Sequence, residues 1–193
     1  MNNASFSIDE WLTRHPQAEV EGIINTTITD MKTTYHVKKI GGAGYWYLPV
    51  PLDPDCVANS DSFGGKYVVR YLAAGAGLDA GFIAHPSFTL PEEYQSIKNP
   101  LSIAWGGMFS SIHKFSSATN WHATELDTAN PPEQRTLAEG IITGIDANYQ
   151  TSLYADAEHG WTTRTNLTDP RKRFAQEGAF LQVVRWFDNY VKK

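Results

Sequence analysis

The chain of 193 residues has a single cysteine, Cys56, and neither a block of charge of one sign nor an N-terminal targeting pattern. One cysteine excludes an internal disulfide and fits a reducing compartment. The start, MNNASFSIDEW, has no basic region followed by an apolar core, so we expect no secretory signal. The net charge of -5 and the lack of a basic run argue against nucleic acid as a partner. These absences predict a cytoplasmic protein.

The composition excludes two further classes, the disordered chain and the membrane-spanning chain. Hydrophobic residues make up 41% of the chain and charged residues 19%, which is the balance of a folded globular protein. We see no internal repeat. The length suits one domain with its own core, so we treat residues 1–193 as a single domain.

Apolar runs alternate with amphipathic stretches along the chain. Helical spacing, proline near a start and glycine near an end predict helices over residues 19–36, 64–77, 131–144 and 170–193, the second ending at Gly75 or Gly77. Short apolar runs predict strands over residues 37–45, 79–86, 100–105 and 149–156. This alternation indicates a parallel sheet covered on both faces, and the sites of such folds lie where the strands end.

Three candidate catalytic features follow one another in the order nucleophile, acid, base. The segment SFGGKYVVRYLA places a small residue and two glycines at a helix start, Asp127 lies after the third predicted strand, and His159 after the fourth. This is the chain order of α/β-hydrolases, in which a nucleophile sits on a strained strand-to-helix turn. The histidine takes its proton and the carboxylate fixes the histidine tautomer. The alternative for His159, in AEHGWTTR, is an ordinary turn residue or solvated loop residue.

Eight segments carry a family resemblance and cover most of residues 6–191. They are FSIDEWLTRH, VKKIGGAGY, FGGKYVVRYLA, GFIAHPSF, PLSIA, ELDTANPPEQR, YQTSLYADAEHGWTTR and FLQVVRWFDNYV. Together they resemble the dienelactone hydrolase family, particularly its fungal members. The resemblance implies an α/β-hydrolase-type fold and a cysteine–aspartate–histidine triad that hydrolyses an ester or lactone and needs no cofactor. Asp127 matches the acid of the family and His159 its base.

Two insertions interrupt this pattern. In the family, GYC would run straight into FGGKYV, whereas residues 46–62 here separate Tyr45 from Phe63. Residues 107–124 likewise separate PLSIAW from ELD. Natural insertions favour exposed loop tips, and the nucleophile turn is the worst place for one.

We hypothesise that both insertions are translated introns. Codons for Trp46-Tyr47 and Asp61-Ser62 can hold a splice donor and acceptor, and joining the flanks restores a cysteine codon in GYCFGGKYV. Codons for Gly107-Met108 and Thr124-Glu125 allow the same, which gives PLSIAWGELDTANPPE. Sequencing the spliced transcript tests this hypothesis.

The resemblance starts part-way into the domain of the family. The early strands, with substrate-binding residues and one oxyanion donor, have no counterpart in this sequence, so we expect a sheet that lacks its N-terminal strands. Such a partial sheet would leave an edge and an apolar face uncovered.

Ser62 is the candidate nucleophile of the chain as written. It immediately precedes Phe63, so it takes the place of the cysteine relative to the following helix, and the backbone N–H of Phe63 would stabilise the oxyanion. Against it, Ser60 stands where the tight turn requires a glycine two residues earlier. Cys56 lacks flanking glycines and reads as an incidental thiol.

Other polar residues have simpler interpretations. His85 ends a strand and has either a role near the site or a packing role. His113 and His122 could be imagined as metal ligands, but no close ligand pair supports a metal site. Arg70 reads as a surface or sheet-edge charge. Trp161, Arg164 and Trp186 could line a pocket, although aromatic residues there are more often core.

We therefore predict a partial α/β-hydrolase of dienelactone hydrolase type, acting as a monomer on a small ester or lactone. Its catalytic residues would be Ser62, Asp127 and His159. The alternative is a catalytically defective or non-catalytic relative that retains only a binding surface. The sequence names no particular substrate, so dienelactones, other lactones and thioesters all stay open.

Overall fold

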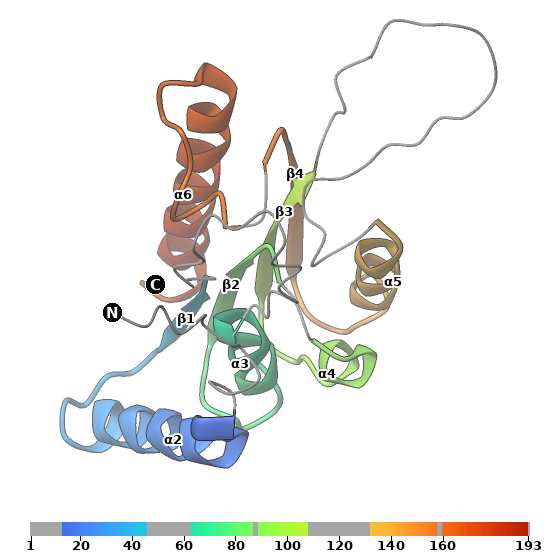
Figure 1. Cartoon of the computed structure of the whole chain (residues 1–193). Coiled ribbons are helices and arrows are strands. Elements are labelled where there is room, and N and C mark those ends of the chain that lie inside the picture. Colours follow the sequence, from blue (N-terminus) through green and yellow to red (C-terminus); the bar gives the residue numbers. More distant parts are fainter. Residues whose placement is uncertain (1–12, 46–62, 87–88, 108–131, 158–159, 193) are drawn as a thin grey trace, which may run out of the picture.

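Four parallel strands form one sheet in a computed structural model that describes residues 13–45, 63–86, 89–107, 132–157 and 160–192 (Figure 1). The strands lie in chain order, β1 beside β2, β3 and β4. The elements are α2 (Gln17–Thr33), β1 (Gly41–Gly44), α3 (Phe63–Tyr71), β2 (Ala80–Ala84), α4 (Pro91–Gln95), β3 (Leu101–Gly107), α5 (Pro132–Ile142), β4 (Tyr149–Ala155) and α6 (Pro170–Tyr190). The predicted parallel sheet is confirmed.

One face of the sheet carries the larger core. Because side chains alternate along a strand, Ile83, Ile103 and Trp105 point to this face, where they meet apolar side chains of α2, α3, α4 and α5. All five residues of β2 and all seven of β3 are buried. Nearly continuous apolar runs are typical of such central parallel strands, which are covered on both sides.

Helix α6 covers the opposite face. Phe82, Ala84 and Ala104 point toward it and pack with Ala175, Ala179 and Val183 of the helix. Small side chains on both partners let the helix approach the sheet closely. Figure 1 accordingly shows three layers, with α6 on one side and α3, α4 and α5 on the other.

A buried glutamine ties α6 to the sheet. The Gln182 side-chain amide donates to Ser102 Oγ at 2.9 Å and to the Ile103 carbonyl at 3.1 Å, while its oxygen accepts from the Tyr154 hydroxyl at 2.9 Å. Gln182 is 6% exposed, so these bonds satisfy polar groups that water does not reach.

The helix predicted over residues 64–77 ends earlier than its glycines suggest, and that boundary is wrong. Helix α3 stops at Tyr71, whose carbonyl accepts from the backbone N–H of Leu78. The Leu72 carbonyl accepts from Lys98 and Asn99, and Ala73 forms an isolated bridge with Ile97. Residues distant in sequence thus take over the helix carbonyls, which a local pattern does not reveal.

Two further differences concern α4 and β3. The short helix α4 was not predicted; it starts at Pro91, and the Glu93 side chain accepts from the Leu90 backbone N–H at 2.8 Å. Strand β3 continues through Gly107, which pairs with Ala155 of β4. The strand therefore extends to the first residue of the predicted second insertion, while the rest of that insertion lies outside the described residues, as do residues 46–62.

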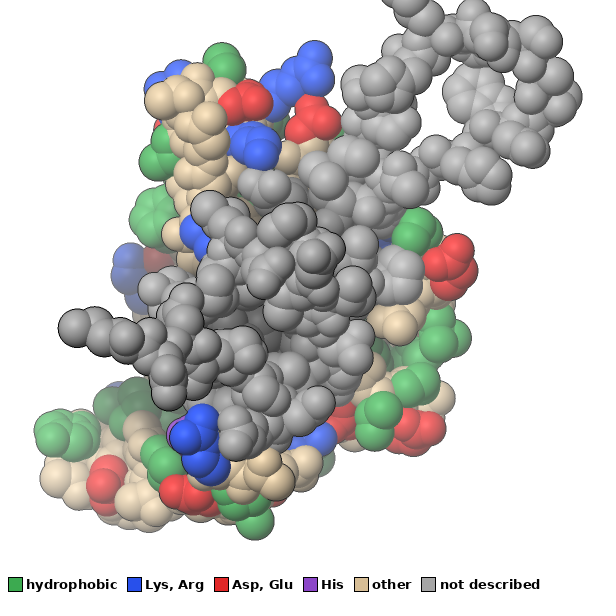
Figure 2. Space-filling model, in the orientation of Figure 1, with side chains coloured by type: hydrophobic (Ala, Val, Ile, Leu, Met, Phe, Trp, Pro, Cys, Tyr) green, Lys and Arg blue, Asp and Glu red, His purple; other side chains and the backbone are tan. Residues whose placement is uncertain are grey.

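The outer side of α6 carries exposed apolar side chains. Phe174, Phe180 and Leu181 are exposed there, beside acidic and basic residues of the same helix (Figure 2). Across the described ranges, no helix is both long and apolar enough to cross a membrane.

Candidate functional site

The carboxyl ends of all four strands lie at one edge of the sheet because the strands are parallel. The chain leaves that edge after Gly44, Ala84, Gly107 and Ala155, the last residues of the four strands. Ligand sites of open α/β sheets lie at this edge. Of the residues predicted to act there, Ser62, Asp127 and His159 lie outside the described residues, and Phe63 is described as the first residue of α3. Their grouping stays a prediction.

The end of β1 touches the start of α3. A Cβ atom built on Gly44 would lie 2.8 Å from the Gly64 carbonyl oxygen and 2.8 Å from Gly65 Cα. A Cβ atom built on Gly64 would lie 2.8 Å from the Tyr45 carbonyl oxygen. Only glycine permits two backbones to approach this closely. Residues 46–62 therefore leave and rejoin the described structure at neighbouring points.

Ser60, whose position argued against Ser62, lies outside the described residues, so that argument stays a prediction. The glycine that packs against Gly64 is Gly44, at the end of β1. The sequence analysis did not single out Gly44, because residues 46–62 separate it from Gly64 along the chain.

Tyr45 covers the same end of β1. Its ring lies 5.7 Å from that of Phe82, measured between centroids, and burial raises the pKa of its hydroxyl above the ordinary value of 10.0. The phenol therefore stays protonated at neutral pH. The Tyr45 ring provides an apolar surface beside the junction of β1 and α3, and its hydroxyl provides one hydrogen-bonding group.

His85 follows β2 and is fully buried. Its φ is 39, a left-handed conformation that costs energy in a residue other than glycine. Its backbone N–H donates to the Ala104 carbonyl at 2.9 Å, and its Nε2 lies 2.7 Å from the Thr162 hydroxyl. His85 is thus both buried and hydrogen-bonded near the site.

The segment of residues 160–164, which directly follows His159, is held at several points. Trp161 is 1% exposed and its ring lies 4.8 Å from that of Tyr154. The Gln176 side-chain amide of α6 donates to the carbonyls of Trp161 and Thr162 at 3.3 and 3.1 Å. Gly160 has φ 81, and its carbonyl accepts from the backbone of residues 163 and 164. The predicted core positions of Trp161 and of Trp186, which is 8% exposed, are confirmed.

Gly106 makes room for this segment beneath Trp161. A Cβ atom on Gly106 would lie 2.6 Å from the Ala157 carbonyl oxygen and 3.0 Å from Trp161 Nε1. Thr162, Gln176 and Gly106 escaped the sequence analysis because no motif marks them. The glycine pair at the end of β3 was the one available signal for a close approach.

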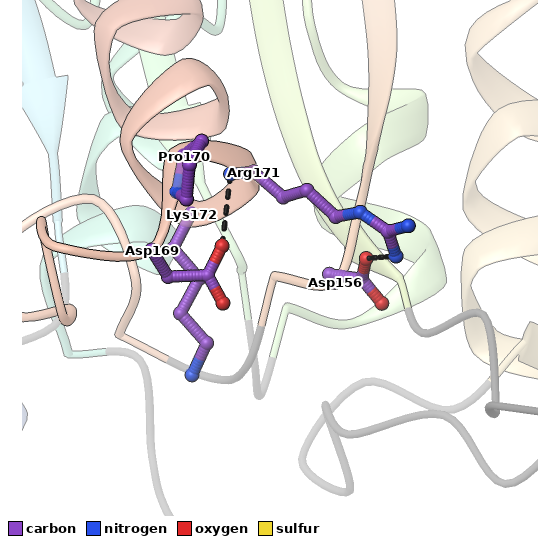
Figure 3. Close-up of a pocket in the computed structure, with 5 residues that line it drawn as sticks. All are labelled: Asp156, Asp169, Pro170, Arg171 and Lys172. Atoms are coloured by element: carbon purple, nitrogen blue, oxygen red, sulfur yellow. Dashed lines mark hydrogen bonds and ion pairs between the residues drawn. The ribbon is translucent and has the colours of Figure 1, made fainter.

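An open hollow lies beside this edge, between the end of β4 and the start of α6 (Figure 3). Asp156, with φ 59, turns the chain out of β4, and its Oδ2 accepts from Arg171 Nη1 at 2.9 Å. Asp169 caps α6 by accepting from the Arg171 backbone N–H at 2.9 Å. Asp156 and Asp169 each accept a hydrogen bond from Arg171, and the ion pair is exposed to solvent. The hollow therefore presents a surface on which negative and positive charges balance.

Arg70 joins three helices on the far side of α3. Its Nη1 lies 3.0 Å from Glu21 Oε1 of α2, and its Nε bonds Glu93 of α4. Two carboxylates therefore occupy the guanidinium, which fits the predicted charge role rather than an anion clamp. The described ranges hold no group of three or more His, Cys, Asp or Glu side chains suited to a metal ion. Cys56, His113 and His122 lie outside those ranges.

Comparison with known proteins gives sequence relatives and a structural neighbour, although no protein-family model matches the chain. Hydrolase pyvD of Aspergillus violaceofuscus is 36% identical over 192 residues, which cover 100% of this chain and 64% of that protein. Hydrolase tropI of Talaromyces stipitatus is 32% identical, with 97% and 63% covered, and dienlactone hydrolase 1 of Gibberella moniliformis is 25% identical, with 100% and 62% covered. The chain thus spans less than two thirds of the length of these relatives.

One structural neighbour is a protein from Klebsiella pneumoniae that is described as a dienelactone hydrolase. It aligns with a TM-score of 0.65 and 11% sequence identity, over 97% of this chain and 70% of that one. At this identity the likeness shows the fold, and it confirms the predicted α/β-hydrolase type of sheet. Taken together, the sequence relatives, the structural neighbour and the four-stranded sheet show that the chain is similar to hydrolases of the dienelactone hydrolase type.

Proposed function

We propose that this chain hydrolyses a small ester or lactone through a nucleophile held between Tyr45 and Phe63, with Asp127 as acid and His159 as base. The observation that carries the proposal is the contact of Gly44 with Gly64. In a nucleophile elbow of the form G-x-nucleophile-x-G, the two glycines flank the reacting residue and let strand and helix approach. Gly44-Tyr45 and Phe63-Gly64 supply both halves of that form.

The chemistry would follow from that turn. The nucleophile attacks the carbonyl carbon as His159 takes its proton, and the backbone N–H of Phe63, at the start of α3, stabilises the oxyanion. Collapse of the tetrahedral species expels the alkoxide, which takes the proton from His159 and leaves an acyl-enzyme. Water, activated by the same histidine, then releases the acid. Asp127 holds the histidine tautomer throughout.

The identity of the nucleophile depends on the insertion. In the chain as written it is Ser62, which immediately precedes Phe63. In a message from which residues 46–62 are spliced, it is a cysteine in GYCFGGKYV. Cysteine suits the role because a thiolate is the stronger nucleophile at neutral pH.

A second candidate function is binding without catalysis. It is favoured by the length of the insertion, because residues 46–62 stand where an active member has one residue. A triad acts as a unit, so a badly aimed nucleophile would remove nearly all turnover while the fold persists.

Hydrolysis of a small aryl ester distinguishes the two. We would compare the chain as written with a version lacking both insertions, each with and without His159→Ala. Turnover that His159→Ala abolishes in either version supports the hydrolase. If neither version shows His159-dependent turnover, the hydrolase proposal fails and the binding role is preferred.

A further inference from the structure

We infer that His85 is a positioning residue: through Thr162 it fixes residues 160–164, the segment directly attached to His159. The inference rests on the proposed role of His159 as base and deepens that site. His85 comes from the end of β2, whereas Thr162 belongs to the connection between β4 and α6. Their hydrogen bond therefore links two parts of the edge that are separated by 77 residues in sequence.

The bond is strong for its place in the fold. His85 Nε2 and Thr162 Oγ1 are 2.7 Å apart, and the His85 side chain is fully buried. Replacing Thr162 by a residue without a hydroxyl would remove this partner from the buried Nε2 of His85, which is costly where water does not take its place. The bond therefore ties the segment, at Thr162, to the end of β2.

The backbone at His85 supports a specific role. Residue 85 has φ 39, and it directly follows a strand whose five residues are all buried. Strained backbone that the surrounding structure maintains is concentrated at functional sites. Here the left-handed turn directs the imidazole toward Thr162 as the chain leaves the strand.

Other contacts hold the segment from different sides. Gln176 bonds the carbonyls of Trp161 and Thr162 from α6, and Trp161 packs on Tyr154 of β4. His85 adds a hydrogen bond from the end of β2, a central strand of the sheet. A base must stay within hydrogen-bond reach of its nucleophile, so a segment fixed on the side of β2, β4 and α6 is the support that His159 needs.

Hydrogen exchange on the full chain tests the inference independently of activity. The backbone N–H groups of Thr163 and Arg164 bond the Gly160 carbonyl at 3.1 and 3.0 Å and report on the segment. We expect Thr162→Val to accelerate their exchange about tenfold, because a hydrogen bond to a buried group is lost. Thr162→Ser keeps a hydroxyl and should exchange like the parent.

His85 is tested with the same readout. His85→Leu should accelerate exchange at the two amides as Thr162→Val does, whereas His85→Gln places a nitrogen at the same number of bonds from Cβ and should restore protection. Thr168→Val is the matched control, since its hydroxyl bonds Asn166 in an exposed part of the same connection. Exchange in α3 should be unchanged in every variant.

Activity supplies the second readout. In whichever version hydrolyses the aryl ester, Thr162→Val should lower kcat about tenfold with KM unchanged, and Thr162→Ser should recover it. If no version turns over, the proposed function fails, and exchange still decides whether His85 holds the segment. Unchanged exchange in Thr162→Val, acceleration that includes α3, or an unchanged kcat despite faster local exchange would each overturn the inference.

Discussion

Gly44 at the end of β1 lies directly against Gly64 in the first turn of α3, so that a Cβ atom on Gly44 would lie 2.8 Å from the Gly64 carbonyl oxygen. The strand and helix therefore meet as closely as in a short strand-to-helix turn, although residues 46–62 lie between them in sequence. The insertion interrupts the chain without separating the two elements that it connects.

The first prediction concerns this contact. Gly44→Ala and Gly64→Ala should each destabilise the fold by about 1–3 kcal/mol, because the new methyl group meets backbone atoms that can move only with their strand or helix. Urea unfolding of each variant measures the change. Gly22→Ala and Gly140→Ala are the controls, since nothing lies within 4 Å of a Cβ atom at either helical position. They should stabilise by roughly 0.5–1 kcal/mol, and a similar gain at Gly44 would refute the close approach.

The second prediction concerns Gln182. Gln182→Leu should cost about 1–3 kcal/mol, because it leaves the Ser102 hydroxyl and the Ile103 carbonyl without their buried partner. Gln17→Leu removes only an exposed bond to Glu21 within α2 and should change stability by less than about 0.5 kcal/mol. Thermal or urea unfolding of the pair gives the comparison. Equal stabilities would show that the network contributes nothing.

The third prediction is a loss of stability at alkaline pH. Burial raises the pKa of Tyr94 above its ordinary value of 10.0. The folded protein holds this phenolic proton more tightly than the unfolded chain, so the contribution is fully present below the unfolded-state pKa and is lost as pH rises above it. Unfolding free energy should therefore fall above about pH 10. Tyr94→Phe should flatten that decline, whereas Tyr35→Phe, at an exposed position, should leave its slope unchanged.

Local pattern was sufficient for the four strands and for every helix except the short α4, apart from the residue at which α3 ends. The runs around Phe82 and Ile103 are apolar without alternation, as central parallel strands are, and the sheet follows from helices placed between them. Proline at the start of α5 and α6 marks their first turns correctly.

Long-range partners decided what the pattern missed. Helix α3 ends at Tyr71 because Leu78 bonds its carbonyl, and neither residue signals the other in sequence. The bond between His85 and Thr162 is of the same kind: a histidine after a strand and a threonine in a loop have many possible partners, and only the folded sheet brings these two together.

The last prediction concerns the nucleophile turn itself. If one residue is all that the Gly44 and Gly64 contact requires, a variant in which a single cysteine replaces residues 46–62 should fold with β1 and α3 unchanged. In a chain also lacking residues 107–124, it should hydrolyse an aryl ester at least tenfold faster than the chain as written, because the thiol would stand on the turn next to the start of α3. A cysteine–glycine pair in place of the single cysteine is the matched control: it carries the same thiol on a looser turn and should be slower. Equal rates for the two linkers, or a faster rate for the chain as written, would mean that the turn does not aim the nucleophile.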